Sequence, residues 1–218
     1  MLRSLTTLFA LLSLVVVSTG CDSFLSPEAA TVVPDGELPV ARVAPDAPPL
    51  NATEVSFWAV RGEAREVEIR YATEAGYNGK CLRFVVPAQA LLRHADGSVV
   101  EPGDSVQITV RVLDPQQFLF EFDPGGLRFD AAHPARLEVR YRWADDDVNG
   151  DGAVDDRDAE DLERLQLWRQ ESPGEPWTKL PSTHLAGIQE VHADITGFTR
   201  YALASDRRPD VISSGFGN

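Results

Sequence analysis

From residue 54 onward, apolar and polar residues alternate in short runs separated by turn residues. Alternation with a period of two turns one side of a segment toward a core and the other toward solvent, which is typical of a β-strand. The runs are 55–60, 66–71, 81–85, 105–112, 118–122, 127–129, 137–143, 165–169, 177–180, 188–195 and 199–204. Short strands at this spacing, with no long helical pattern, predict an all-β fold, an antiparallel β-sandwich.

One acid-rich segment, residues 144–164, interrupts the alternation between two of these runs. Its second half, residues 155–165, predicts a short helix, because Leu162 and Leu165 are three positions apart. We therefore expect an insertion that consists of a loop and a short helix between two strands of the sandwich. The runs 165–169 and 177–180 that follow predict a hairpin around Ser172-Pro173-Gly174.

The loop of this insertion carries oxygen donors at the spacing of a calcium-binding loop of the EF-hand kind. The donors at loop positions 1, 3, 5, 9 and 12 are Asp147, Asn149, Asp151, Asp155 and Asp158. Gly152 is at position 6, where the chain turns sharply and a positive φ is required. Ala153 at position 7 offers its backbone carbonyl, and Val154 at position 8 is expected to point into a core.

The alternative interpretation of this loop is an acidic surface turn without an ion. The segment 145–161 crowds nine carboxylates together, and Arg157 is the basic residue within it. Such crowding is unfavourable without a cation, and an acidic turn does not require this spacing of donors. Calcium is expected rather than magnesium, which keeps its waters and prefers fewer carboxylates.

The first fifty residues predict a leader and a tether. Residues 1–20 combine Arg3, the apolar run 5–17 and small residues, as a secretory signal peptide does. The apolar run is shorter than the roughly 18–20 residues of a spanning helix. The next segment, residues 21–50, is rich in proline and predicts an extended tether: Pro27, Pro34, Pro39, Pro45, Pro48 and Pro49. The folded domain is expected over residues 51–206, able to fold without the tether, and a flexible tail over 207–218.

Ser18-Thr19-Gly20-Cys21 resembles the lipobox of bacterial lipoproteins, with Ser18 where that family usually has leucine. The resemblance implies a diacylglyceryl group on Cys21, a lipid bilayer as partner and a place in the bacterial cell envelope, either in the outer membrane on its periplasmic face or at the cell surface. A soluble secreted protein and an uncleaved anchor remain the alternatives. The second cysteine, Cys81, is expected to be buried in a strand, and a Cys21–Cys81 disulfide remains open only if Cys21 carries no lipid.

Two further resemblances concern the domain and its loop. The loop is similar to those of dockerin modules, which also close with Asp at position 12; a single loop makes cohesin recognition improbable, since cohesin-binding dockerins carry two. Across residues 81–204, the segments 86–91, 126–129 and 197–201 resemble strands of the ZU5 β-sandwich. Some ZU5 proteins cleave themselves at His-Phe-Ser; here that position is Gly197-Phe198-Thr199, which keeps a hydroxyl but lacks the adjacent base.

Net charge and motif content narrow the function classes. A net charge of −14 argues against nucleic acid as a partner. Nearly all basic residues are arginines, since the only lysines are Lys80 and Lys179. Either adaptation to salt or the base composition of the genome accounts for this preference. No nucleophile elbow, phosphate-binding loop or dinucleotide motif is present. The histidines, expected at the surface or at strand ends without an acid at ligand spacing, are His94, His133, His184 and His192.

These observations predict a non-catalytic, lipid-anchored β-sandwich that holds one calcium ion and has a binding or structural role. One alternative is a self-processing or hydrolytic enzyme, with cleavage at Phe198-Thr199 as its most specific form. A second alternative is an adhesin-like module that binds glycan or protein. Tryptophans on one face would then form the binding surface. The tryptophans are more simply explained as core residues: Trp58, Trp143, Trp168 and Trp177.

Overall fold

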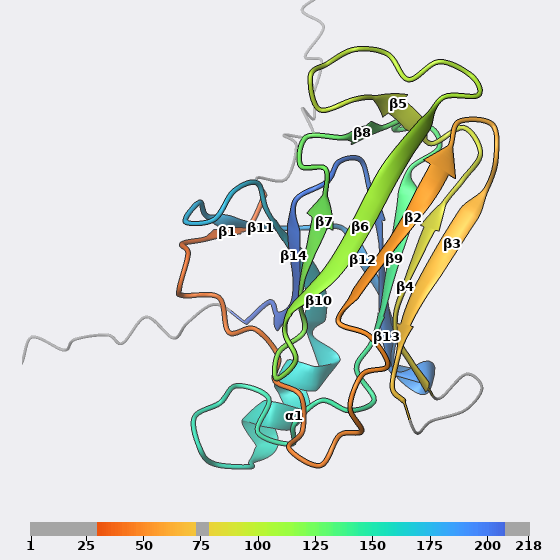
Figure 1. The fold of residues 1–218 in the computed structure, drawn as a ribbon. Coiled ribbons are helices and arrows are strands. Elements are labelled where there is room, and N and C mark those ends of the chain that lie inside the picture. Colours follow the sequence, from red (N-terminus) through yellow and green to blue (C-terminus); the bar gives the residue numbers. More distant parts are fainter. Residues whose placement is uncertain (1–29, 73–78, 208–218) are drawn as a thin grey trace, which may run out of the picture.

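The computed structural model describes residues 30–72 and 79–207, which form two antiparallel β-sheets packed face to face (Figure 1). This arrangement confirms the predicted all-β sandwich. The helices that are described in full are α1 (Asp156–Glu163) and the short 3-10 helix η2 (Ala186–Ile188). None of the described helices is long and apolar enough to cross a membrane.

The first sheet has seven strands in the order β1-β11-β10-β14-β7-β6-β2. Their bounds are β1 Val32–Val33, β11 Trp177–Lys179, β10 Leu165–Gln170, β14 Arg200–Ser205, β7 Leu119–Asp123, β6 Ser105–Asp114 and β2 Glu54–Val60. The expected hairpin is present, since β10 and β11 are antiparallel neighbours with Trp168 opposite Lys179. The strand β1, by contrast, comes from the segment expected to be a tether.

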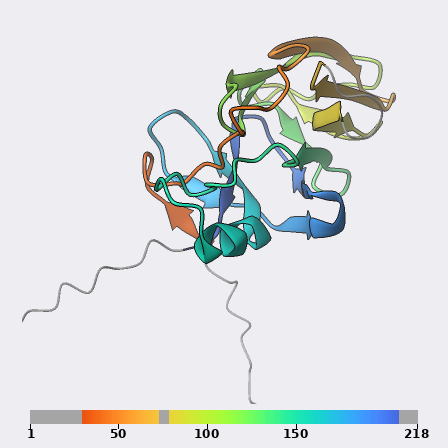
Figure 2. The same cartoon turned by 90° about the horizontal axis from the view of Figure 1, so that it is seen from below.

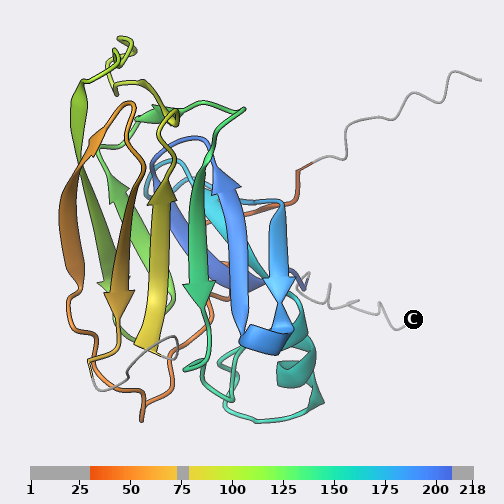
Figure 3. The same ribbon diagram turned by 90° about the vertical axis from the view of Figure 1, so that its right-hand side faces the viewer.

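The second sheet has five strands in the order β12-β13-β9-β4-β3, which Figure 3 shows side by side. Their bounds are β12 Ser182–Leu185, β13 Glu190–Ile195, β9 Ala135–Arg140, β4 Lys80–Val86 and β3 Arg65–Arg70. A small ribbon of β5 (Leu91–Arg93) and β8 (Arg128–Phe129) closes one end of the sandwich. The sequence pattern did not predict β12 or η2, because residues 182–185 lack a clear alternation.

Aromatic side chains fill the space between the two sheets. Phe84, Phe122, Phe129 and Phe198 are all buried, and neighbouring ring centroids lie 5.0–5.6 Å apart. Edge-to-face and tilted pairs of this kind add about 0.5–1.5 kcal/mol each to the burial of their surface. The inward residues of the alternating runs thus form one continuous core, which is what the period of two predicts.

A smaller core lies on the opposite face of the first sheet. Trp168 and Trp177 pack there with Leu38 and Ala202, and both tryptophans are almost fully buried. The prediction of core tryptophans is confirmed for these two. It is wrong for Trp58, which is 57% exposed because it points outward from the edge strand β2.

Residues 38–50, which we call the strap, run across the end of the sandwich that carries α1 (Figure 2). Ala41 is fully buried; its N–H donates to Leu203 O (2.8 Å), and its carbonyl accepts from Phe118 N (3.0 Å). The prediction of a free tether is therefore wrong for residues 30–50. Proline removes backbone donors but leaves carbonyls and neighbouring amides, and these bond to both sheets. The predicted leader and the start of the tether, with Cys21, lie outside the described residues.

Candidate metal centre

The acidic loop 147–158 joins the two layers of the sandwich, since β9 belongs to the second sheet and β10 to the first. It lies beside α1 at the same end as the strap (Figure 1). Gly152 has φ +89°, as predicted for position 6, and Gly150 has φ +75°. An L-residue is strained in this left-handed region, so the two glycines permit the tight coil of the loop.

Side-chain oxygens of the predicted ligands accept hydrogen bonds from the loop's own backbone. The Asp147 carboxylate accepts from Gly150 N at 2.8 Å and from Gly152 N at 3.0 Å. Asn149 Oδ1 accepts from Asp151 N (2.8 Å), and Asp151 Oδ1 accepts from Ala153 N (2.9 Å). These bonds curl residues 147–153 around their donor side chains.

The last two predicted side-chain ligands also form the N-terminal cap of α1. Asp155 is the N-cap residue, and its Oδ1 accepts from Arg157 N at 2.8 Å. Asp158 is 2% exposed; its Oδ2 accepts from Asp155 N (2.9 Å) and its Oδ1 from Asn149 N (3.3 Å). The loop is thereby closed onto the first turn of the helix, where a negative charge is favourable.

Asp161 holds the helix against the first sheet. Its Oδ1 accepts from Ser205 Oγ at 2.7 Å and lies 3.1 Å from Arg207 Nε, at the end of β14. Asp161 is 4% exposed, so both partners compensate the loss of hydration of a buried carboxylate. The sequence spacing did not single out this residue, because its role depends on a strand that lies 44 residues further along the chain.

The expectation for Val154 is wrong. Val154 is 70% exposed, whereas Val148 at position 2 of the loop is 3% exposed and packs into the main core. The loop is attached to the sandwich by its first residues and by its helix. Its middle therefore faces solvent.

The described chain brings one trio of ligand-type side chains within 4.8 Å of one another, and it is not in this loop. It consists of Glu138, Glu190 and His192. The carboxylates of the loop accept hydrogen bonds from backbone amides of the same loop and of the first turn of α1. The residue types suit calcium, since the loop offers oxygen donors from four carboxylates, one amide and one backbone carbonyl.

The trio on the second sheet is part of an ion-pair network instead of an evident metal site. Lys80 Nζ lies 2.9 Å from Glu138 and 2.7 Å from Glu190, and His192 Nε2 lies 2.7 Å from Glu190. Arg140 adds a second cation 3.8 Å from Glu190. The ammonium group already occupies the position between the carboxylates that a metal would take.

This network corrects the expectation for His192, which was predicted to lack an acid at ligand spacing. Glu190 and His192 are two positions apart on β13, so they share a face, and Glu138 is opposite His192 on β9. The Glu-x-His spacing is visible in the sequence. The contribution of Glu138 and Lys80 depends on strand register, which the alternation alone does not specify.

The remaining candidate residues have structural surroundings. Thr199 is buried and its hydroxyl donates to the carbonyl oxygen of Gln170. Cys81 is a buried free thiol in β4, as predicted. The lipidation residue Cys21 lies outside the described residues.

The sequence matches no protein-family model, and a search of curated proteins finds no relative. The resemblances to lipoproteins, to the ZU5 sandwich and to dockerin loops therefore stay predictions, and the argument for function rests on the site itself.

Proposed function

We propose that this chain is a non-catalytic, lipid-anchored module of the bacterial envelope whose β-sandwich is stabilised by one calcium ion. Its role is binding or structural. The calcium ligands are the carboxylates of Asp147, Asp151, Asp155 and Asp158, the amide oxygen of Asn149 and the carbonyl oxygen of Ala153. Water completes the roughly six to eight oxygens that calcium takes at about 2.3–2.6 Å.

The observation that carries the calcium proposal is the position of Asp158. Its carboxylate is buried, and its two oxygens bond to the amides of loop residues 149 and 155. A carboxylate at position 12 that closes the loop onto the first turn of the following helix is the arrangement that an EF-hand loop uses. The bond to Asp155 N belongs to the capping box of α1, but the bond to Asn149 N also draws the start of the loop onto the helix, as calcium binding requires.

The ion is expected to be structural. The loop connects the two sheets, so an ion that binds it fastens β9 and the strap-side end of the sandwich to α1 and β10. Calcium that contacts only the folded state at 100 times its dissociation constant adds about 2.7 kcal/mol to the free energy of unfolding. For a domain of this size that corresponds to a rise of roughly 5–10 °C in Tm.

The test compares thermal melts of each protein in chelator and in millimolar calcium, with calorimetry of binding. Asp147→Ala and Asp151→Ala should abolish the calcium-dependent rise in Tm. Asp147 also accepts two loop amides, so its variant loses stability without calcium; the difference between the two melts of one variant is therefore the measured quantity.

Asp156→Ala is the matched control, since Asp156 is an exposed acidic residue in the first turn of α1 and is not a predicted ligand. It should keep most of the rise. A wild-type protein whose melt is unchanged by calcium and that releases no binding heat would leave an acidic turn and remove the calcium proposal.

A glycan-binding role is the second candidate, and one observation favours it. Trp58 projects from the outer face of β2, with Gln107 opposite it on β6. Next to this pair, the hydroxyls of Ser56 and Thr109 are 2.8 Å apart. An exposed indole beside an amide and hydroxyls suits the apolar face and hydroxyl groups of a sugar ring. Loss of glycan retention on Trp58→Ala, with an unchanged melt, would support it.

A further inference from the structure

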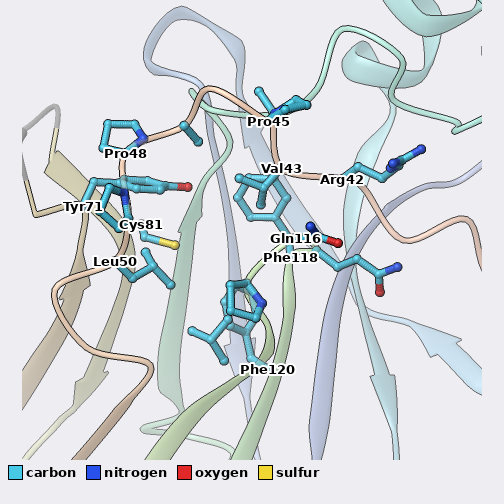
Figure 4. A pocket seen from close by; sticks show the side chains of 16 residues that line it. Arg42, Val43, Pro45, Pro48, Leu50, Tyr71, Cys81, Gln116, Phe118 and Phe120 are labelled. Atoms are coloured by element: carbon cyan, nitrogen blue, oxygen red, sulfur yellow. The ribbon is translucent and has the colours of Figure 1, made fainter.

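A cavity of about 240 Å³ lies between the two sheets, at the end that the strap crosses. Its mouth is formed by strap residues, of which Pro45 and Pro49 are exposed. Its floor is formed by Phe118 and Phe120, which are 1% and 0% exposed. Figure 4 shows these side chains around one common space.

We propose that this cavity binds a small neutral molecule, the size of a single aromatic ring with a short substituent, that carries one carbonyl-type hydrogen-bond acceptor. This inference goes beyond the calcium site and does not depend on it. It rests on the size of the cavity, on its mainly apolar lining residues and on the buried hydroxyl of Tyr71 in its wall.

The size and lining set the apolar part of the ligand. Apolar cavities of about 150 Å³ stay dry and bind benzene, whereas pockets for drug-sized ligands measure about 300–1,000 Å³. A cavity of about 240 Å³ therefore accepts one ring and a short side group. Its apolar lining residues are Val43, Ala44, Pro45, Ala47, Pro48, Pro49, Leu50, Val112, Pro115, Phe118 and Phe120.

Tyr71 sets the polar part of the ligand. Tyr71 is 3% exposed, and the one hydrogen-bonding group beside its hydroxyl among the described residues is the thiol of Cys81, which is a weak partner. In Figure 4 the hydroxyl oxygen and the sulfur of Cys81 point to the same side, toward Val43 and Phe118. A buried hydroxyl without a strong acceptor is unfavourable, so a ligand acceptor that reaches it is bound selectively.

Burial opposes an anionic ligand at the Tyr71 end of the cavity. Arg42 is the one charged residue among the sixteen described residues that line the cavity, and its side chain packs beside Gly150 of the acidic loop. Burial raises the pKa of the Tyr71 phenol, to which the Cys81 thiol adds, and burial raises the pKa of Cys81 to about 12. The same desolvation that opposes a phenolate or a thiolate opposes a bound carboxylate.

The wall of the cavity is fixed before any ligand arrives. Val43 N donates to Gln116 O (2.8 Å), and Ala72 N donates to Pro49 O (2.8 Å), so both ends of this wall are bonded to the sandwich. Pro45, Pro48 and Pro49 have restricted φ angles. Because the wall is already ordered, binding costs it little conformational entropy. More of the contact energy then contributes to the affinity for a small ligand.

The test uses three probes of one shape: acetophenone, ethylbenzene, which lacks the carbonyl, and benzoate, which is charged. Ligand-observed NMR titrations of the full chain should give acetophenone about tenfold tighter than ethylbenzene, the difference expected from one hydrogen bond. Benzoate should not bind. Failure of both neutral probes to bind at millimolar concentration would overturn the proposal.

Three variants distinguish the loss of a ligand contact, either the hydrogen bond to Tyr71 or the apolar contact with the cavity, from a general loss of folding. Tyr71→Phe should lose the preference for acetophenone, because the bound carbonyl then has no donor, and it should still melt cooperatively. Ala47→Phe fills the cavity and should bind neither, whereas Ala131→Phe, at an exposed position away from the cavity, should bind both. An unchanged preference for acetophenone in Tyr71→Phe, or unchanged binding in Ala47→Phe, would contradict the proposal.

Discussion

Lys80 is a buried cation in the ion-pair network of the second sheet. Its side chain is 5% exposed, and its ammonium group lies between two glutamates that are also buried, Glu138 and Glu190. Such a network adds little net stability compared with apolar residues of the same volume, but the loss of one partner leaves an uncompensated buried charge. The stability of the folded protein already includes the desolvation cost of burying these charges. A substitution that removes one partner adds a further cost, because a buried charge then loses its ion pair.

Lys80→Met should therefore lower the free energy of unfolding, toward the lower end of about 3–5 kcal/mol, because Glu138 and Glu190 lose their shared ammonium group but keep Arg83 and Arg140. Urea denaturation with a fluorescence readout measures this change. Arg65→Met is the control, since the Arg65–Glu63 pair is about half exposed and its loss should cost less than 1 kcal/mol. Equal effects of the two substitutions would show that burial of the network does not matter for stability.

At the scale of elements, the strap and β1 distinguish this sandwich from the one that the sequence predicted. Leu38 and Ala41 are buried, and Asp35 Oδ1 accepts hydrogen bonds from Gln170 Nε2 (2.9 Å) and Trp177 Nε1 (3.3 Å). Segment 30–50 thus covers the outer core of the first sheet and the open end between the layers. The folded domain begins well before residue 51.

A chain that begins at residue 51 should consequently be much less stable than one that begins at residue 30. It uncovers Trp168 and Trp177 and removes the wall of the cavity; Leu38→Ala alone is expected to cost about 2–5 kcal/mol. Thermal melts of the two chains and of Leu38→Ala in the longer chain measure these losses. Identical melts of the two chains would mean that the segment packs on the domain without stabilising it.

The strands were predictable because each inward residue of an alternating run also faces a core in three dimensions. The acidic loop and its helix were predictable for a similar reason, since their hydrogen bonds connect residues close in sequence, such as Asp155 and Asp158. The strap was not predictable from composition. Its prolines suggest an extended segment, which it is, but its order comes from partners such as Leu203 and Gln116.

The parts of the site that depend on register were also hidden in the sequence. Lys80 meets Glu138 across 58 positions, and Tyr71 faces a strap whose position no local pattern indicates. Trp58 shows the same limit. The alternation places it on one face of β2 but does not indicate whether another layer covers that face. Local periodicity specifies faces, and only tertiary packing specifies what lies against them.

For the whole molecule, the apolar run that ends at Cys21 predicts attachment to a bilayer through acyl chains. The mature protein should partition with membranes, and mass spectrometry of its N-terminus should detect a diacylglyceryl cysteine. Cys21→Ser should release it into the soluble fraction, with a melt like that of the wild type because Cys21 precedes the described domain. A mature N-terminus at another residue, or an unchanged membrane fraction in Cys21→Ser, would contradict lipid attachment.

The strap has one further consequence, because it touches both proposed sites. Its Arg42 carbonyl accepts from Asp145 N and its Ala44 N donates to Trp143 O, both at 2.9 Å, just before the acidic loop; the next strap residues wall the cavity. Two binding events that draw on one segment are thermodynamically linked, and the linkage is reciprocal. If calcium changes the affinity of the cavity for its ligand by some factor, the ligand changes the affinity of the loop for calcium by the same factor. The concentration of calcium and the concentration of the small neutral molecule would then jointly set how much of the protein is bound to each.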